Sequence, residues 1–65
     1  MLDTITYEVY SSRLKKFKAF VKSQYGLAII SQVKDGHYVK VTVRNKYSSD
    51  LWTPLGRFYR SEIKI

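Results

Sequence analysis

Five basic side chains fall among the apolar residues of one short segment, SRLKKFKAFVKSQYG at residues 12–26. Lys15, Lys18 and Lys22 have the three- and four-residue spacing that aligns side chains along one side of a helix, where like charges are slightly destabilising. No acidic residue lies between positions 11 and 34 to neutralise them. Because each phosphate that a cation neutralises releases counterions, we expect a polyanion-binding surface here, with a merely solvated helix face as the alternative. The residues of this basic surface are Arg13, Lys15, Lys16, Lys18 and Lys22.

A second candidate surface lies on the strand expected at residues 37–45, where tyrosine and basic residues share one side. Aromatic rings on a sheet can stack on unpaired bases while nearby cations hold the phosphate backbone. Tyr38, Lys40 and Arg44, with Tyr10 on a neighbouring strand, would form such a platform. The glycine- and phenylalanine-rich consensus of RNA-recognition domains is absent. The alternative is that Tyr38 packs on aliphatic residues of the preceding strand.

The segment at residues 46–60 combines tryptophan, tyrosine and arginine, which are the residue types enriched in protein-interface hot spots. A loop held by Pro54 would present Trp52 rigidly to a partner. The preferred alternative is that Trp52 and Leu51 close the open end of a small core. The candidate protein-interface residues are Tyr47, Trp52, Arg57, Phe58, Tyr59 and Arg60.

The only histidine is His37, which follows Gly36 at the start of a strand. In this Gly-His pair the chain resembles small messenger-RNA interferases, which use a histidine on a strand in a similarly small α+β domain. The interferase domain usually begins with a helix, whereas this chain is expected to begin with a strand. The resemblance implies a ribonuclease toxin with His37 as its catalytic residue. A lone histidine beside a hairpin turn is more often a polar turn residue, so we rank this alternative lowest.

No other reaction centre is indicated by the sequence. A metal site would need clustered ligands, and the chain has one histidine and no cysteine. The glycine-rich motifs that cradle nucleotide phosphates are also absent. We therefore expect no enzyme, no metal and no cofactor.

Size and charge limit the class of protein further. A chain of 65 residues predicts a single domain, residues 1–65, near the lower size limit for a self-sufficient core. Twelve Lys and Arg against five Asp and Glu give a net charge of +7, which attracts phosphate backbones, anionic membranes or acidic proteins. We expect no signal peptide, because residues 1–10 have neither a basic start nor an apolar stretch. The longest apolar run, residues 27–30, is too short to span a bilayer. We expect a cytoplasmic protein that does not bind membranes.

The first strand and the main helix are predicted from periodicity. Residues 3–10 alternate between apolar and polar side chains, which is typical of a strand. From residue 13 the apolar residues recur with a helical period, which predicts a helix over about 12–25 that ends at Gly26. The apolar stripe of this helix is Leu14, Phe17, Phe20 and Val21.

A hairpin follows, with strands at residues 27–34 and 37–45 joined by a type I′ turn at Asp35-Gly36. That turn pairs Lys34 with His37 and sets the register of the rest. The core side of the hairpin is then expected to be Ala28, Ile30, Val39, Val41 and Val43. Its other side is expected to be Ile29, Ser31, Val33, Tyr38, Lys40, Thr42 and Arg44.

The last part of the chain permits two interpretations. A short helical turn is expected around Asp50 to Leu55. A final strand over residues 57–65 is favoured by the alternation of Ile63-Lys64-Ile65, with Tyr59, Ser61, Ile63 and Ile65 on one side. The rival is a helix beginning at Pro54, so the sequence does not decide whether residues 54–65 form a strand or a helix.

These elements predict an α+β fold with one main helix packed on a mixed sheet of three to four strands. The order is β-α-β-β, a short turn or helix, and β, which is a two-layer sandwich on a reduced split β-α-β, or ferredoxin-like, plan. The crossover helix implies parallel pairing of the first two strands. One sheet face would be left largely uncovered.

The functional expectation is a small non-enzymatic module that binds DNA or RNA through its phosphates, with tyrosines stacking on bases. The alternative is an accessory protein of phage or plasmid type that binds and inhibits or modulates a host protein with an acidic surface. A homodimer formed through the sheet edge is a further possibility, because a short chain gains stability from association.

Overall fold

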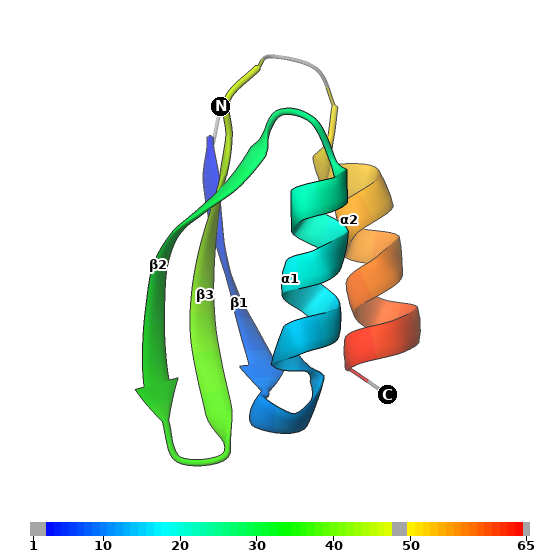
Figure 1. The fold of residues 1–65 in the computed structure, drawn as a ribbon. Coiled ribbons are helices and arrows are strands. Elements are labelled where there is room, and N and C mark those ends of the chain that lie inside the picture. Colours follow the sequence, from blue (N-terminus) through cyan, green and yellow to red (C-terminus); the bar gives the residue numbers. More distant parts are fainter. Residues whose placement is uncertain (1–2, 48–49, 65) are drawn as a thin grey trace.

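The α+β class predicted from the sequence is confirmed. The computed structural model describes residues 3–47 and 50–64. These residues contain three antiparallel strands and two α-helices, with a 3₁₀ turn (η1) and a π-helical turn (η2). In chain order the elements are β1 (Thr4–Tyr10), η1 (Ser11–Arg13), α1 (Leu14–Ser23), β2 (Leu27–Asp35), β3 (Tyr38–Asn45), α2 (Trp52–Phe58) and η2 (Tyr59–Ile63) (Figure 1).

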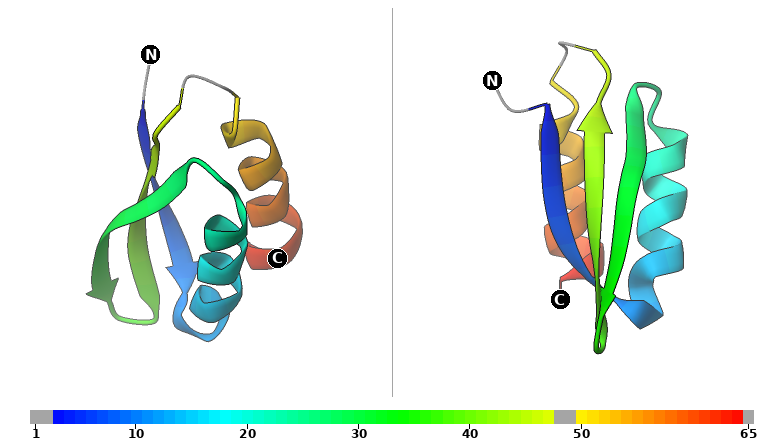
Figure 2. Two further views of the ribbon diagram at one scale, coloured as in Figure 1. Left: turned by 45° about the horizontal axis from the view of Figure 1, so that its top comes forward. Right: turned by 90° about the vertical axis from the view of Figure 1, so that its left-hand side faces the viewer.

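The strand order within the sheet is β1-β3-β2. The expected parallel pairing of the first two strands in a mixed sheet is wrong, because β3 lies between them and pairs antiparallel with both. The crossover through α1 still makes β1 and β2 run in the same direction. Both helices lie on one face of the sheet (Figure 2). The other sheet face, called the free face below, carries no helix of the described residues.

The α1 helix packs on the sheet through the apolar stripe that its sequence predicts. Phe17 and Val21 are fully buried, and Leu14 and Phe20 pack against the same core. The chain then turns at Gly26, which has a φ of 105°. A Cβ atom there would lie 2.7 Å from Cδ2 of Tyr47, so glycine is required both by the backbone conformation and by this close approach.

The hairpin register differs from the predicted one. Asp35 pairs with Tyr38, so the two-residue loop is Gly36-His37 rather than Asp35-Gly36. Gly36 has a φ of 63°, and no non-glycine residue of the described chain has a positive φ. A type I′ turn needs positive φ at both central positions, so the predicted turn type is also wrong. Glycine at the first central position suits the type II′ alternative.

A β-bulge between Ile29 and Ser31 shifts the pairing once more. Val39, Val41 and Val43 are buried as expected, but Ile30 is 55% exposed and does not belong to the core. Instead Ile29 lies opposite Val43 and packs against the core, while Ala28 pairs with Arg44 on the free face. Side chains alternate between the two faces along a strand, so one inserted residue is enough to exchange the β2 side chains that face the core.

The C-terminal segment is helical, so the favoured final strand is wrong and the rival interpretation is confirmed. Leu55 and Ile63 are fully buried, and Phe58 and Tyr59 pack against the core. These four residues lie three, four and eight positions apart, which is the period of a helix face. They therefore fill the core beside α1. Ile65 lies outside the described residues, as do Ser48 and Ser49 of the predicted turn.

Aromatic rings connect α1 and η2 to β1. Tyr59 lies over Tyr7 with ring centroids 4.9 Å apart, and Phe17 contacts both rings at 5.5 and 6.2 Å. The Tyr59 hydroxyl donates a hydrogen bond of 2.6 Å to the backbone carbonyl of Glu8. This cluster fixes η2 against the sheet and thereby positions the charged residues at the C-terminal end.

Candidate nucleic-acid interface

The positive charge of the molecule is concentrated on one helix. Residues 11–23, which form η1 and α1, hold five of the twelve cations and none of the five acids. The rest of the chain holds seven cations and all five acids, so it is close to neutral. A long-range field that attracts anions is therefore centred on α1.

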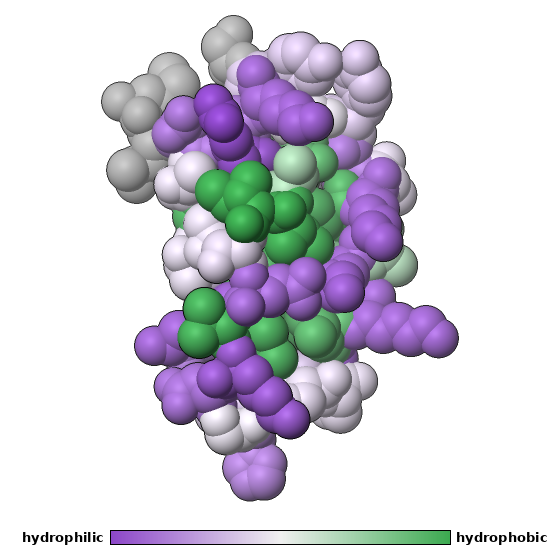
Figure 3. All heavy atoms as spheres, turned by 60° about the vertical axis from the view of Figure 1, so that its left-hand side comes forward, coloured by the Kyte–Doolittle hydropathy of each residue, from purple (hydrophilic) through white to green (hydrophobic). Residues whose placement is uncertain are grey.

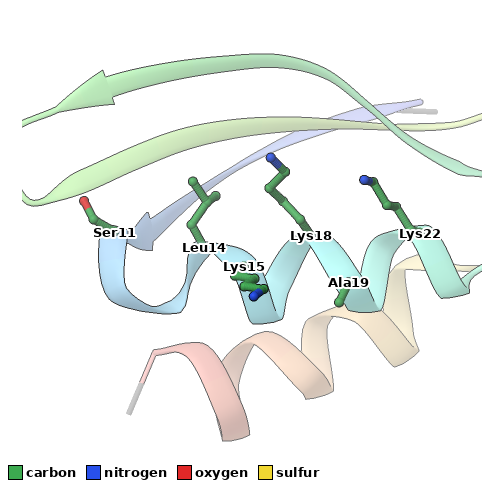
Figure 4. A pocket seen from close by; sticks show the side chains of 6 residues that line it. All are labelled: Ser11, Leu14, Lys15, Lys18, Ala19 and Lys22. Atoms are coloured by element: carbon green, nitrogen blue, oxygen red, sulfur yellow. The ribbon is translucent and has the colours of Figure 1, made fainter.

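Three lysines of α1 lie around one surface hollow, as their spacing predicts. The hollow has a volume of about 490 Å³ and is lined by Ser11, Leu14, Lys15, Lys18, Ala19 and Lys22. Figure 4 shows Lys18 and Lys22 extending from α1 toward the strands. Within the described residues, Lys15, Lys18 and Lys22 form no ion pair. Their charges are available to an external anion.

The other two cations of the predicted basic surface are held by the C-terminal turn. Lys16 forms an ion pair of 3.0 Å with the Glu62 carboxylate, and both side chains are about half exposed. The Arg13 guanidinium donates a 2.7 Å hydrogen bond to the Glu62 backbone carbonyl. Arg13 and Lys16 thus connect α1 to η2, and the basic surface divides into three free lysines and two tethered cations.

The free face of the sheet brings together the predicted platform residues. Cross-strand pairing places Tyr38 beside Tyr10, Lys40 beside Glu8, and Arg44 beside Thr4. The Lys40 ammonium also lies 4.0 Å from the Asp35 carboxylate. Lys40 is therefore flanked by acids on both neighbouring strands, and the field of this face is weaker than the sequence alone indicated.

Tyr10 and Tyr38 form a stacked pair at the end of the sheet nearest the hairpin turn. Their ring centroids are 4.6 Å apart, and the Tyr38 hydroxyl donates a 3.1 Å hydrogen bond to the Tyr10 hydroxyl. This hydrogen bond is the main cause that raises the pKa of Tyr38. Tyr38 thus packs on Tyr10 of the neighbouring strand β1. A hollow of about 380 Å³ adjoins the pair, lined by Tyr10, Ser11, Ser12, His37 and Tyr38.

The candidate protein-interface residues do not form one exposed patch. Phe58 stacks on Phe20 with ring centroids 4.1 Å apart, and Tyr59 is part of the aromatic cluster over β1. Trp52 is partly buried and packs against the core, as the preferred alternative predicts. Tyr47 is exposed but stacks on Tyr25 at the other end of the sheet. Arg57 and Arg60 are exposed on the helices.

His37 is an exposed residue of the hairpin turn. Its backbone carbonyl accepts two hydrogen bonds from Ser11, one from the backbone N–H at 2.9 Å and one from the hydroxyl at 3.0 Å. No local sequence pattern indicates this contact, since it joins residues 26 positions apart. Glu62 was also missed as a partner of α1, because a final strand was expected there.

Comparisons with protein-family models, curated proteins and solved structures found no match. Among the described residues, no helix is long and apolar enough to cross a membrane. The same residues contain no group of three or more His, Cys, Asp or Glu side chains that could hold a metal ion.

Proposed function

We propose that this protein is a small non-enzymatic module that binds the phosphate backbone of nucleic acid through α1. The observation that carries the proposal is the set of three unpaired lysines, Lys15, Lys18 and Lys22, around one hollow of α1. The like charges of Lys15, Lys18 and Lys22 weaken the helix, and phosphates would relieve that repulsion. Phosphate contacts carry no sequence information, so we expect weak sequence specificity.

The platform on the free face contributes less to binding in this proposal. Lys40 and Arg44 would add phosphate contacts, but Glu8 and Asp35 lie on the same face and oppose them. Arg44 lies opposite Thr4 and Ala28, which are uncharged. We therefore assign the main part of the binding free energy to α1 and a minor part to the free face.

The test is a matched pair of charge reversals. One variant reverses Lys15, Lys18 and Lys22 to Glu, and the control reverses Lys46, Arg57 and Arg60 to Glu. The three control residues are exposed and form no ion pair within the described structure. Both variants change the net charge equally. Fluorescence anisotropy with labelled DNA and RNA, at about 50 and 200 mM salt, should show a much larger loss of affinity for the α1 variant. Equal losses would show that only net charge matters.

A second candidate function is association with protein, favoured by exposed aliphatic side chains on β2. Ile30 and Val33 are 55% and 56% exposed on a strand whose outer edge is unpaired in the described structure. Figure 3 shows hydrophobic surface on this side, interrupted by hydrophilic side chains. A second copy is a suitable occupant, because the free face carries both Glu8 and Lys40 and can complement itself. An acidic host protein would instead use the α1 surface.

Two measurements separate these candidates. Light scattering after size-exclusion chromatography gives the oligomeric state of the wild-type protein and of a Val33→Asp variant. A dimer that the variant disrupts supports self-association. A pull-down with and without nuclease distinguishes nucleic acid from an acidic protein, because only a protein partner survives the nuclease.

We further propose that the fold is a reduced ferredoxin-like plan of a cytoplasmic protein. In support, β3 lies between β1 and β2, as a split β-α-β unit requires. In this plan α2 and η2 stand where a second helix would, and a fourth strand is missing from the described residues.

A further inference from the structure

Three surface hollows adjoin one another, two along α1 and one beside η1. The first, of about 270 Å³, lies between α1 and β2 and shares Lys18 and Lys22 with the α1 hollow. The α1 hollow in turn shares Ser11 with the hollow beside the Tyr10–Tyr38 pair. The three together form a track that is basic along the helix and aromatic at its end.

We propose that this track binds single-stranded nucleic acid, with an unpaired base in the hollow beside Tyr10 and Tyr38 and its phosphates on Lys15, Lys18 and Lys22. This inference rests on the proposed function and names the substrate class of the same site. The occupant follows from charge and chemistry: phosphates match the unpaired lysines, and a base can stack on an aromatic ring whatever its sequence. Tyr10 and Tyr38 are 39% and 37% exposed, so part of each ring is available.

The contact of Ser11 with the hairpin turn makes the two parts of the track one site. Ser11 begins the helical layer, and His37 belongs to the turn between β2 and β3. Two hydrogen bonds to one carbonyl hold the aromatic hollow at a fixed place relative to the first turn of α1. A preorganised site loses less conformational entropy on binding.

A duplex cannot use this site fully. Its bases are paired and stacked inside the helix, and extrusion of one base costs a few kcal/mol, as in base-flipping enzymes. A single strand offers unstacked bases at no such cost. The aromatic hollow is within the size of ordinary ligand pockets, roughly 300 to 1,000 Å³. We therefore expect a preference for single strands that phosphate contacts alone would not give.

The test compares three probes that have similar phosphates and different bases. They are an oligothymidylate of about twelve nucleotides, the same length of abasic backbone, and a duplex, with an oligouridylate added to compare RNA. Tyr38→Leu removes the ring and keeps apolar bulk. It should weaken oligothymidylate binding roughly tenfold and leave abasic binding unchanged. Tyr25→Leu is the matched control, because Tyr25 belongs to the stacked pair at the other end of the sheet.

The outcomes distinguish this inference from the proposed function. If wild-type protein binds all probes equally and Tyr38→Leu has no effect, the base site is overturned while phosphate binding by α1 stands. If no probe binds at low salt, both proposals are overturned. Circular dichroism of each variant verifies folding. Tyr38→Phe gives a second measurement, because it keeps the ring and should bind oligothymidylate like wild type even where Tyr38→Leu is unstable.

Discussion

Ser11 and His37 connect the start of the helical layer to the turn of the β2–β3 hairpin. The backbone N–H and the hydroxyl of Ser11 both donate to the His37 carbonyl, at 2.9 and 3.0 Å. No side-chain hydrogen bond caps η1 or α1 in the described structure. This contact places the tip of the β2–β3 hairpin beside the start of the basic helix.

The Ser11 hydroxyl should therefore contribute measurably to stability. Ser11→Ala removes one of the two hydrogen bonds and keeps the backbone one, so we expect a loss of about 0.5–1 kcal/mol in the free energy of unfolding. Urea denaturation followed by the fluorescence of Trp52, the only tryptophan, measures this. Ser12→Ala is the control, since Ser12 makes no hydrogen bond through its side chain within the described residues. Equal effects of the two substitutions would rule out a specific role for Ser11.

The salt dependence of binding should report the three unpaired lysines. Each phosphate contact with a single strand contributes about 0.7 to the slope of log K against log salt. Replacing Lys15, Lys18 and Lys22 by Gln should thus lower the magnitude of the slope by about 2, measured by anisotropy over a salt series. Their removal also relieves repulsion along α1, so the melting temperature should not fall. An unchanged slope would exclude these lysines from the interface.

Glu62 should act as a local competitor for anions. Its carboxylate pairs with Lys16 at 3.0 Å, and Glu62→Gln would free that ammonium and remove a negative charge near α1. We expect affinity for a single strand to rise by about two- to fivefold at low salt. An exposed ion pair contributes little to stability, so the free energy of unfolding should change by less than about 1 kcal/mol. Asp35→Asn, on the free face, changes the net charge equally and should have a smaller effect.

Much of this structure could be predicted from the pattern of the sequence. The period of the apolar residues placed β1, α1, β2 and β3, and the spacing of Lys15, Lys18 and Lys22 placed them on one side of α1. These are local properties, so they survive in the folded chain. The C-terminal helix was also readable, because Leu55, Phe58, Tyr59 and Ile63 follow a helical period. The alternation of Ile63-Lys64-Ile65 covers only three residues and is too short to outweigh that helical period.

The remaining differences come from contacts between distant residues. The bulge at Ile30 depends on how β2 pairs with β3 and packs on α1, which no local pattern encodes. The balance of charge on the free face depends on how β3 pairs with β1 and β2. This pairing places Lys40 between Glu8 and Asp35. The ties from Arg13 and Lys16 to Glu62 join residues more than forty positions apart. Periodicity cannot reveal such pairs.

Asp50 should make the stability of α2 depend on pH. Its carboxylate accepts hydrogen bonds from the Thr53 hydroxyl at 2.7 Å and the Thr53 N–H at 3.3 Å. The hydroxyl bond, and then the backbone bond, lower the pKa of Asp50 below its ordinary 3.8. The stabilisation is therefore complete above the unfolded-state pKa and is lost as pH falls through the lower folded-state pKa.

The variant Asp50→Ala tests this dependence. The melting temperature of wild type should exceed that of the variant at neutral pH, and the difference should shrink below about pH 4. Thermal melts by circular dichroism across the acidic range measure it. A difference that stays constant down to the lowest pH would contradict the role assigned to the carboxylate.

The most direct test of the central claim is a ¹H–¹⁵N correlation spectrum of the protein during titration with an oligothymidylate. The claim is that α1, which holds the unbalanced charge, is where nucleic acid binds. The amide resonances of Lys15, Lys18 and Lys22 should shift most, with Tyr38 shifting alongside them and α2 staying unchanged. Shifts confined to α2 or to the β2 edge, or no shifts at low salt, would contradict the account.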